Sequence, residues 1–127
     1  MLSPTAIREL LDLQGRLRAD VVFLSESHLN NDKAEILRVK LDFDCFHLVA
    51  SDGRAGGLVL YYNLSNEVIL NYSSDNVIDG IVMDRNSPSW RITGFYGEPS
   101  WERKYLSWTY IKDIHANNSG PWMILGD

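Results

Sequence analysis

Three short apolar runs in this sequence each lead to a side chain that could take part in hydrolysis. The runs and the side chains that follow them are 20–24 with Glu26, 90–95 with Tyr96, and 122–125 with Asp127. Metal-dependent hydrolases often place a carboxylate at the carboxyl end of a strand, because carboxylate oxygens are the ligands that Mg²⁺ prefers. We therefore expect the two acids and the phenol to belong to one site.

Each of these side chains also has a plainer interpretation. Glu26 could be an ordinary surface glutamate after a strand, Tyr96 a half-buried strand tyrosine, and Asp127 a turn aspartate. The apolar run directly before Gly126 favours the functional interpretation of Asp127.

The composition is that of one globular domain. The chain has 127 residues, of which 45% are hydrophobic and 23% are charged, enough for a single core. Its net charge of −5 argues against strong nonspecific binding of nucleic acid, which needs a basic face. A metal-dependent enzyme that acts on phosphates remains possible, since a bound metal supplies positive charge locally.

The sequence indicates an intracellular protein, in the nucleus or the cytoplasm. It contains one cysteine, Cys45, so no internal disulfide can form, and the thiol fits a reducing compartment. The first residues lack the basic and apolar regions of a secretory signal. No apolar stretch approaches the roughly 20 residues that a membrane-spanning helix needs. We expect Cys45 to be a small buried side chain.

The first part of the chain predicts two helices around a strand. Ser3 and Pro4 are good capping and first-turn residues for a helix that runs to about Arg18. The apolar run 20–24 predicts a strand buried on both faces. The polar cluster 30–32 predicts the start of a second helix.

The middle and end of the chain predict strands, one helix and a last strand. The expected strands cover 45–50, 58–62, 67–73, 77–83 and 90–96, and their short polar turns favour an antiparallel meander. Ser100 could cap a helix with Trp101, Tyr105 and Trp108 on one side, more typical of core packing than of a base-stacking platform. The run 122–125 then forms the last strand.

Four ordered segments resemble the endonuclease/exonuclease/phosphatase superfamily, and in particular the endonuclease domain at the start of plant LINE-type retrotransposon polyproteins. The segments are 20–27, 55–61, 92–97 and 122–127. Each is weak alone, but their order and spacing make the resemblance specific, and it covers almost the whole chain. The resemblance implies an α+β fold, the amino-terminal part of a four-layer αββα sandwich.

The resemblance also implies roles for the candidate site residues. Glu26 matches the metal-binding glutamate, Tyr96 the tyrosine beside the scissile phosphate, and Asp127 the aspartate that prepares the attacking water. Arg103 matches a frequent arginine that could contact a phosphate, although pairing with Glu102 is the simpler interpretation. The implied cofactor is Mg²⁺ or Mn²⁺, bound weakly here, and the implied partner is DNA.

The sequence departs from the family pattern in several places. His28 stands where relatives commonly carry lysine, which changes the local charge. The first strand of the family, with its asparagine, has no counterpart here. Neither do the asparagine after the Gly-Asp pair, the later strands and the terminal aspartate–histidine pair. We therefore expect residues 1–127 to form a single partial domain that lacks the first strand and the C-terminal half.

These expectations lead to one function and two alternatives. The function is a fragment of a Mg²⁺-dependent phosphodiesterase, derived from a retroelement DNA endonuclease and inactive by itself. The chain could instead be a non-catalytic remnant or binding module of the same fold, or an active member whose missing half comes from a partner chain.

The missing half predicts an exposed sheet. With the second sheet nearly absent, apolar strand residues would be partly uncovered, and the chain would self-associate through that face. The residues expected to be uncovered are Val59, Val68, Leu70, Val82 and Ile92.

Overall fold

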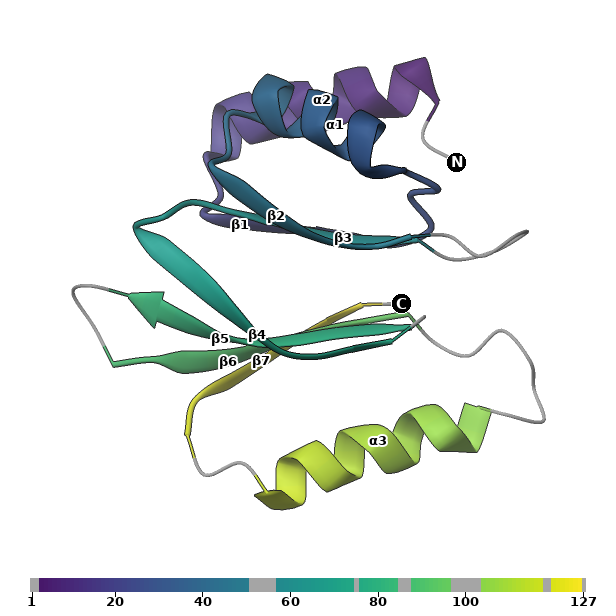
Figure 1. The fold of residues 1–127 in the computed structure, drawn as a ribbon, viewed down its shortest axis with the longest axis vertical. Coiled ribbons are helices and arrows are strands. Elements are labelled where there is room, and N and C mark those ends of the chain that lie inside the picture. The colour runs from purple at the N-terminus through teal and green to yellow at the C-terminus, as the bar shows by residue number, and fades with distance from the viewer. Residues whose placement is uncertain are drawn as a thin grey trace.

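The computed structural model describes residues 3–50, 57–74, 76–84, 88–96, 104–117 and 120–126. Two β-sheets face each other at its centre, with α1 and α2 over the outer side of one sheet and α3 over the outer side of the other (Figure 1). The layers therefore follow the order helix, sheet, sheet, helix, and the expected αββα arrangement is confirmed.

The first sheet contains three strands in the order β1-β3-β2. Its strands are β1 (Val21–Leu24), β2 (Cys45–Val49) and β3 (Leu58–Tyr62). Both neighbours of the central strand β3 run antiparallel to it. Every residue of β3 is buried, as expected for the middle strand of a sheet that is covered on both faces.

The second sheet contains four strands in the order β4-β5-β6-β7. Its strands are β4 (Asn66–Ser74), β5 (Val77–Asp84), β6 (Trp90–Phe95) and β7 (Trp122–Gly126). The first three form an antiparallel meander, and β7 pairs in parallel with β6 after the chain has passed through α3. The parallel pairing brings the carboxyl ends of β6 and β7 to the same edge of the molecule.

The helices begin and end with ordinary capping interactions. The helix α1 (Pro4–Leu17) starts at Ser3, whose Oγ accepts a hydrogen bond from the Ala6 amide at 3.1 Å. The helix α2 (Asn31–Leu41) starts at Asn30, whose side chain accepts from the Lys33 amide at 2.8 Å. The helix α3 is Lys104–Asn117. None of the described helices is long and apolar enough to cross a membrane.

The apolar core has two parts, one on each side of the first sheet. One part lies under α1 and α2, where Leu37 and Leu41 pack against Val59 and Tyr61 of β3. The Tyr61 hydroxyl donates to the Ala34 carbonyl at 2.8 Å, which ties α2 to the sheet. The other part lies between the sheets, where buried side chains of β3 meet those of the second sheet; these are Leu58, Leu60, Tyr62, Val68, Ile78, Val82 and Ile92.

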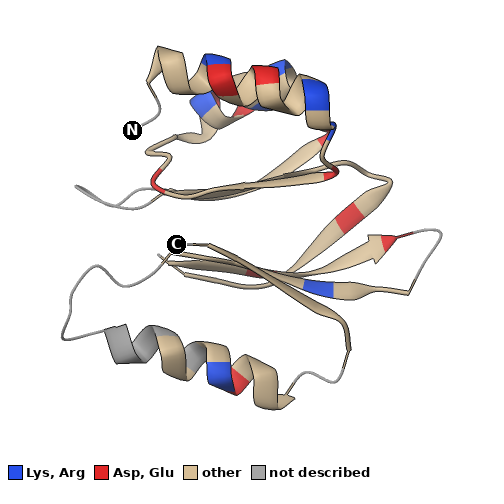
Figure 2. Cartoon of the chain, turned by 180° about the vertical axis from the view of Figure 1, so that it is seen from behind, with Lys and Arg blue, Asp and Glu red and all other residues tan. Residues whose placement is uncertain are grey.

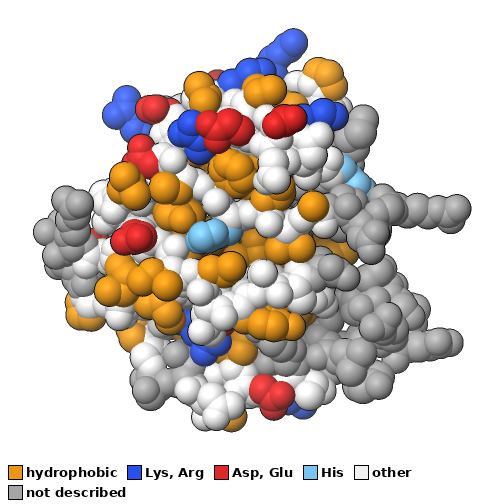
Figure 3. All heavy atoms as spheres, in the orientation of Figure 1, with side chains coloured by type: hydrophobic (Ala, Val, Ile, Leu, Met, Phe, Trp, Pro, Cys, Tyr) orange, Lys and Arg blue, Asp and Glu red, His pale blue; other side chains and the backbone are white. Residues whose placement is uncertain are grey.

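Charged side chains are concentrated on the helices. Figure 2 shows most of the coloured residues on α1 and α2, and few on the strands. The opposite face, in Figure 3, shows charged groups over the helical layer and apolar groups in a band below it. Between the sheets the buried side chains are mainly apolar, and His47 lies there with its Nε2 3.1 Å from the Val68 carbonyl oxygen.

The structure corrects the expected arrangement of the strands. A single meander from 45 to 96 was wrong, because β2 and β3 pair in the first sheet and β4, β5 and β6 pair in the second. The expectation that the second sheet is nearly absent was also wrong, since four strands are present.

Most of the strand residues expected to be exposed are buried, since Val68, Val82 and Ile92 lie between the two sheets and Val59 lies under α1 and α2. Val59, Val68, Val82 and Ile92 are at most 2% exposed, and Leu70 alone of that set is open to solvent, at 42%.

Two smaller expectations were also wrong. The strand β1 is half-buried along its length because it lies at an edge of its sheet, with one neighbour instead of two. Trp108 is 63% exposed, so it does not pack into the core. Trp101 lies outside the described residues, as does the side chain of Tyr105.

Candidate active site

The ends of β1 and β6 meet across the gap between the two sheets. Glu26 follows β1, Tyr96 follows β6, and the Tyr96 hydroxyl donates a hydrogen bond to Oε1 of Glu26. The Glu26 side chain is exposed and Tyr96 is half-buried. Two of the three side chains that the sequence singled out are therefore in direct contact, although 70 positions separate them.

Asp127 and Arg103 lie outside the described residues. The strand that leads to Asp127 is described, and its register pairs Gly126 with Phe95. Asp127 and Tyr96 thus directly follow paired residues on neighbouring parallel strands. The backbone beside Tyr96 is fixed by its amide, which donates to the Asn76 carbonyl at 2.8 Å.

The backbone around Glu26 has an unusual conformation. Glu26 and His28 both have positive φ angles, 50° and 53°, a left-handed region that costs energy for residues other than glycine. Ser27 between them is 1% exposed. Its amide and its hydroxyl both donate to the Gly57 carbonyl, at 3.0 and 3.2 Å, and its Oγ accepts from the Leu29 amide at 3.5 Å. These bonds hold the turn that presents the Glu26 carboxylate.

A glycine is required at position 57, where the backbone lies directly against the turn that Ser27 anchors. The φ of Gly57 is +88°, and a Cβ at this position would lie 2.8 Å from the His28 amide nitrogen. A side chain would push away the turn that Ser27 anchors. The position of the turn beside Gly57 could not be inferred from the sequence, because the two segments lie 30 positions apart.

Gly94 allows the two sheets to approach each other next to the site. A Cβ at Gly94 would lie 2.4 Å from the ring of Phe23. Phe23 lies on β1 shortly before Glu26, and Gly94 lies on β6 shortly before Tyr96. The close contact therefore draws together the two strands whose ends carry the candidate site. Sequence reasoning missed this role, although a glycine inside a strand is a signal for close backbone approach.

A buried polar network crosses the outer face of the second sheet beneath α3. Asp79 of β5 is fully buried, and it accepts hydrogen bonds from Arg91 Nε at 2.8 Å, Thr93 Oγ1 at 2.8 Å and Asn71 Nδ2 at 2.9 Å. Arg91 Nη2 also pairs with Asp79. Burial raises the pKa of Asp79, but the hydrogen bonds from Arg91, Asn71 and Thr93 outweigh it and hold the pKa below its ordinary value.

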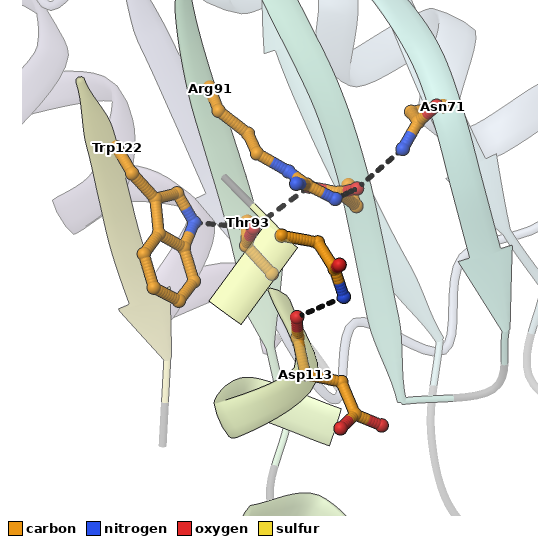
Figure 4. A network of polar contacts seen from close by, with 7 residues as sticks. Asn71, Arg91, Thr93, Asp113 and Trp122 are labelled. Atoms are coloured by element: carbon orange, nitrogen blue, oxygen red, sulfur yellow. Dashed lines mark hydrogen bonds and ion pairs between the residues drawn. The ribbon is translucent and has the colours of Figure 1, made fainter. Parts of the chain in front are cut away.

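The network also fixes the strand that leads to Asp127. The Trp122 Nε1–H of β7 donates to Thr93 Oγ1 at 2.8 Å. Figure 4 shows the side chains of Asn71, Arg91, Thr93 and Trp122 meeting on this face of the sheet, with Asp113 of α3 nearby. The hydrogen bonds thus link all four strands of the second sheet. Periodicity in the sequence gave no sign of this network, because its members lie far apart in the chain.

The chain belongs to the endonuclease/exonuclease/phosphatase family, whose model matches residues 2–127. Comparison with curated proteins gives no match. The family assignment confirms the resemblance that the four sequence segments predicted.

Solved structures with the same fold include an endonuclease domain, a protein complexed with single strand DNA product and a 2′,3′-cyclic phosphatase. The endonuclease domain of TRAS1, a telomere-specific non-LTR retrotransposon, is 13% identical with a TM-score of 0.67, and the match covers 98% of this chain and 53% of that one. TDP2 from D. rerio, complexed with single strand DNA product, is 18% identical with a TM-score of 0.67, covering 95% and 52%. ANGEL2, a 2′,3′-cyclic phosphatase, is 13% identical with a TM-score of 0.65, covering 94% and 42%.

The chain spans about half the length of the structures that it matches. For truncated Caenorhabditis elegans TDP2, another structure of this fold, the match covers 97% of this chain and 54% of that one. At these identities the likeness establishes the fold, and the chemistry has to be argued from the residues of this chain.

Members of the family are generally metal-dependent. The described residues supply some of the oxygen ligands that an ion such as Mg²⁺ would need. The described residues contain no group of three or more His, Cys, Asp or Glu side chains that could hold a metal. Glu26 alone supplies a carboxylate at the described part of the site. Mg²⁺ sites on phosphate enzymes commonly use one or two carboxylates and complete their coordination with water and substrate oxygens, so this donor set is compatible with such an ion.

Proposed function

We propose that residues 1–127 carry one half of a metal-dependent phosphodiesterase site for DNA, derived from a retroelement endonuclease, and have no nuclease activity by themselves. They would form a partial domain, lacking the first strand and the C-terminal half of the family's complete domain. The observation that carries this proposal is the hydrogen bond between Tyr96 and Glu26, which joins the ends of two strands from different sheets.

In this proposal each candidate residue has a stated role. Glu26 would hold a Mg²⁺ or Mn²⁺ ion, since its exposed Oε2 makes no hydrogen bond to another described residue. When bound, such an ion polarises a phosphate and stabilises negative charge on the leaving oxygen. Tyr96 would turn its hydroxyl hydrogen from Glu26 to a phosphate oxygen as charge develops there. Asp127 would orient and deprotonate the attacking water, and Arg103 would contact a neighbouring phosphate.

The remaining proposals concern the affinity for the metal ion, the cellular compartment and self-association. One or two carboxylates without a substrate phosphate should bind Mg²⁺ at millimolar concentration or more weakly, about −4 kcal/mol at best. We propose a reducing intracellular compartment, in keeping with the one free thiol, Cys45. Self-association would use the exposed apolar side chains of the edge strand β4, among them Ile69, Leu70 and Tyr72.

Metal binding at the site can be tested without activity. We expect Mn²⁺ added to isotopically labelled protein to broaden the amide signals around Glu26 and Tyr96 first, and around Asp127 if it belongs to the site. Glu26→Gln should abolish this broadening, while Glu67→Gln on the exposed edge of β4 should leave it unchanged. Broadening that centres elsewhere, or that survives in Glu26→Gln, would refute the assignment of Glu26.

Activity is tested by nicking of supercoiled plasmid with Mg²⁺. We expect no nicking by residues 1–127 above a Glu26→Ala control, because catalytic groups act as a unit and losing several of them leaves little beyond background. Nicking that depends on Glu26 would show that the chain needs no further half, or that two copies complete each other.

A second candidate is a non-catalytic binding module of the same fold. The specific observation in its favour is that the described part of the site offers one carboxylate and no metal-binding cluster. Binding of single-stranded DNA that is unaffected by Mn²⁺ and by Glu26→Gln would favour this module over the catalytic half.

A further inference from the structure

A hollow of about 240 Å³ lies between α1 and α2, on the helical side of the first sheet. We call it the α1–α2 groove. Its apolar lining consists of Ile7 of α1, Leu29 of the connecting loop, and Ile36 and Leu37 of α2. The floor is fixed, since Leu29 and Leu37 are 8% and 3% exposed. Ile36 is 56% exposed and forms an open apolar wall. The groove could therefore receive one large apolar side chain.

The rim of the groove is basic. Lys33 and Lys40 line it, and neither ammonium group pairs with a carboxylate of another described residue. His28 also contributes to the lining, and no Asp or Glu does. The chain has a net charge of −5, yet two lysines and no acid line this hollow. Its charge complements an acidic ligand.

The spacing on α2 defines the ligand further. Lys33, Ile36, Leu37 and Lys40 follow one another at intervals of three, one and three residues, so they form one face of the helix. The two lysines are about 10.5 Å apart along the helix axis, at about 1.5 Å per residue. A partner helix with acids seven positions apart and apolar residues between them would present the matching pattern.

The lining argues against nucleic acid as the occupant. The described lining contains no Phe, Tyr, Trp or Arg, and His28 is the one described side chain there on which a base could stack. The four aliphatic side chains would then face sugar and phosphate groups, and these contacts would add little to the binding free energy. A lone small molecule is also a poor fit, because the hollow is open and smaller than the 300–1,000 Å³ that is typical of ligand pockets.

We propose that the α1–α2 groove binds a short acidic amphipathic helix of a partner protein, with an apolar anchor over Ile36 and carboxylates near Lys33 and Lys40. This interaction is independent of the proposed phosphodiesterase chemistry. It belongs to the class in which an amphipathic helix lays its apolar face into a groove. The lysines would mainly set the association rate and the choice of partner, and the anchor would supply most of the affinity.

The test is selection of helical 16-residue peptides from a display library against the 127-residue chain. Enriched peptides should carry large apolar residues flanked by Asp or Glu. We expect a synthesised winner to bind roughly tenfold or more weakly to Lys33→Glu/Lys40→Glu and to Ile36→Glu. Raising the salt concentration should weaken its binding to the wild-type chain, because exposed charge pairs are screened.

Matched controls separate this groove from general charge effects. Lys112→Glu on the exposed side of α3 changes the charge by as much as either single lysine substitution in the groove, and should leave binding unchanged. All the changed side chains are exposed, and circular dichroism checks that each variant folds. The proposal is overturned if no acidic motif is enriched, or if the winner binds the groove variants as tightly as the wild type. It is equally overturned if a labelled dT12 oligonucleotide binds the chain and loses that binding in Lys33→Glu/Lys40→Glu.

Discussion

The outer faces of the two sheets are covered in different ways. Over the first sheet, α1 and α2 bury an apolar layer that includes Leu37, Leu41 and Tyr61. Over the second sheet, α3 lies above a charged network centred on Asp79, and Ile114 is its one described side chain that is buried. Among the described residues, the first face buries apolar area removed from water, whereas the second carries a few directional hydrogen bonds between its strands. The two faces should therefore respond differently to substitution, pH and salt.

The largest effect should come from breaking the buried pair in the second sheet. Asp79→Ala leaves the Arg91 guanidinium, 14% exposed, without its carboxylate. Removing one partner of a buried pair typically costs about 3–5 kcal/mol, and urea unfolding should show a loss of this size. The double variant Asp79→Leu/Arg91→Met should regain most of the stability, because it removes both charges together. An Asp79→Ala variant as stable as the wild type would mean that the network contributes nothing.

A cavity under α2 should lower the free energy of unfolding somewhat less, and the loss should not depend on salt or pH. Leu37→Ala removes a 3% exposed side chain from the apolar layer, and such changes cost about 2–5 kcal/mol. The loss should not vary with salt or between pH 3 and 7, since no charged group is involved. Measuring the unfolding free energy at two salt concentrations tests this difference between the faces.

Contact between the sheets should be sensitive to one methyl group. Gly94→Ala places a Cβ 2.4 Å from the Phe23 ring, so one strand must shift. We expect a loss of about 1–3 kcal/mol, together with changed amide shifts at Glu26 and Tyr96. The second substitution Phe23→Leu should restore part of both. Gly15→Ala is the control, because nothing lies within 4 Å of that position.

Acid should weaken the second sheet before the first. The folded pKa of Asp79 is held below its ordinary value by Arg91, Asn71 and Thr93 against the effect of burial. The contribution of Asp79 to the free energy of unfolding is therefore complete above the pKa of the unfolded chain, about 3.9. It is lost as the pH falls from there through the pKa of the folded protein. Asp79→Asn should show a smaller loss of stability than the wild type over this range. Parallel curves for the two proteins would contradict the assignment.

The smallest effect should come from the outer surface of α3. Trp108 is 63% exposed, so Trp108→Gln should change the unfolding free energy by no more than about 0.5 kcal/mol. A larger loss, measured by the same urea titration, would mean that the aromatic side of α3 belongs to the core after all.

Local features of the sequence predicted most of the elements. The caps at Ser3 and Asn30 marked where α1 and α2 begin, and the apolar runs marked the strands. The partition into two sheets was not predictable in this way, because a short polar turn such as 63–65 looks the same whether the chain folds back or crosses to another sheet. Pairing across sheets depends on contacts between distant residues, and periodicity does not report these.

The proximity of Glu26 and Tyr96 was predictable from the sequence, whereas the residues that hold the surrounding backbone in place were not. The runs before Glu26 and Tyr96 pointed to one edge of the molecule, and the two side chains do touch there. The turn around Ser27 and the close approach at Gly94 depend on distant partners. A glycine inside a strand is a signal for close approach but does not name the partner, and the turn around Ser27 has no local signal.

The parallel pairing of β6 with β7 has a consequence for the order of folding. The strands β4, β5 and β6 are joined by short turns, whereas β7 pairs only after the chain has passed through α3. Pairings between distant segments form late, because closing the loop costs entropy before the new contacts can stabilise the chain. Ile124→Val in β7 should therefore speed unfolding and leave the folding rate almost unchanged. A nascent or partly folded chain would then have a finished meander while the edge beside Tyr96 is still open.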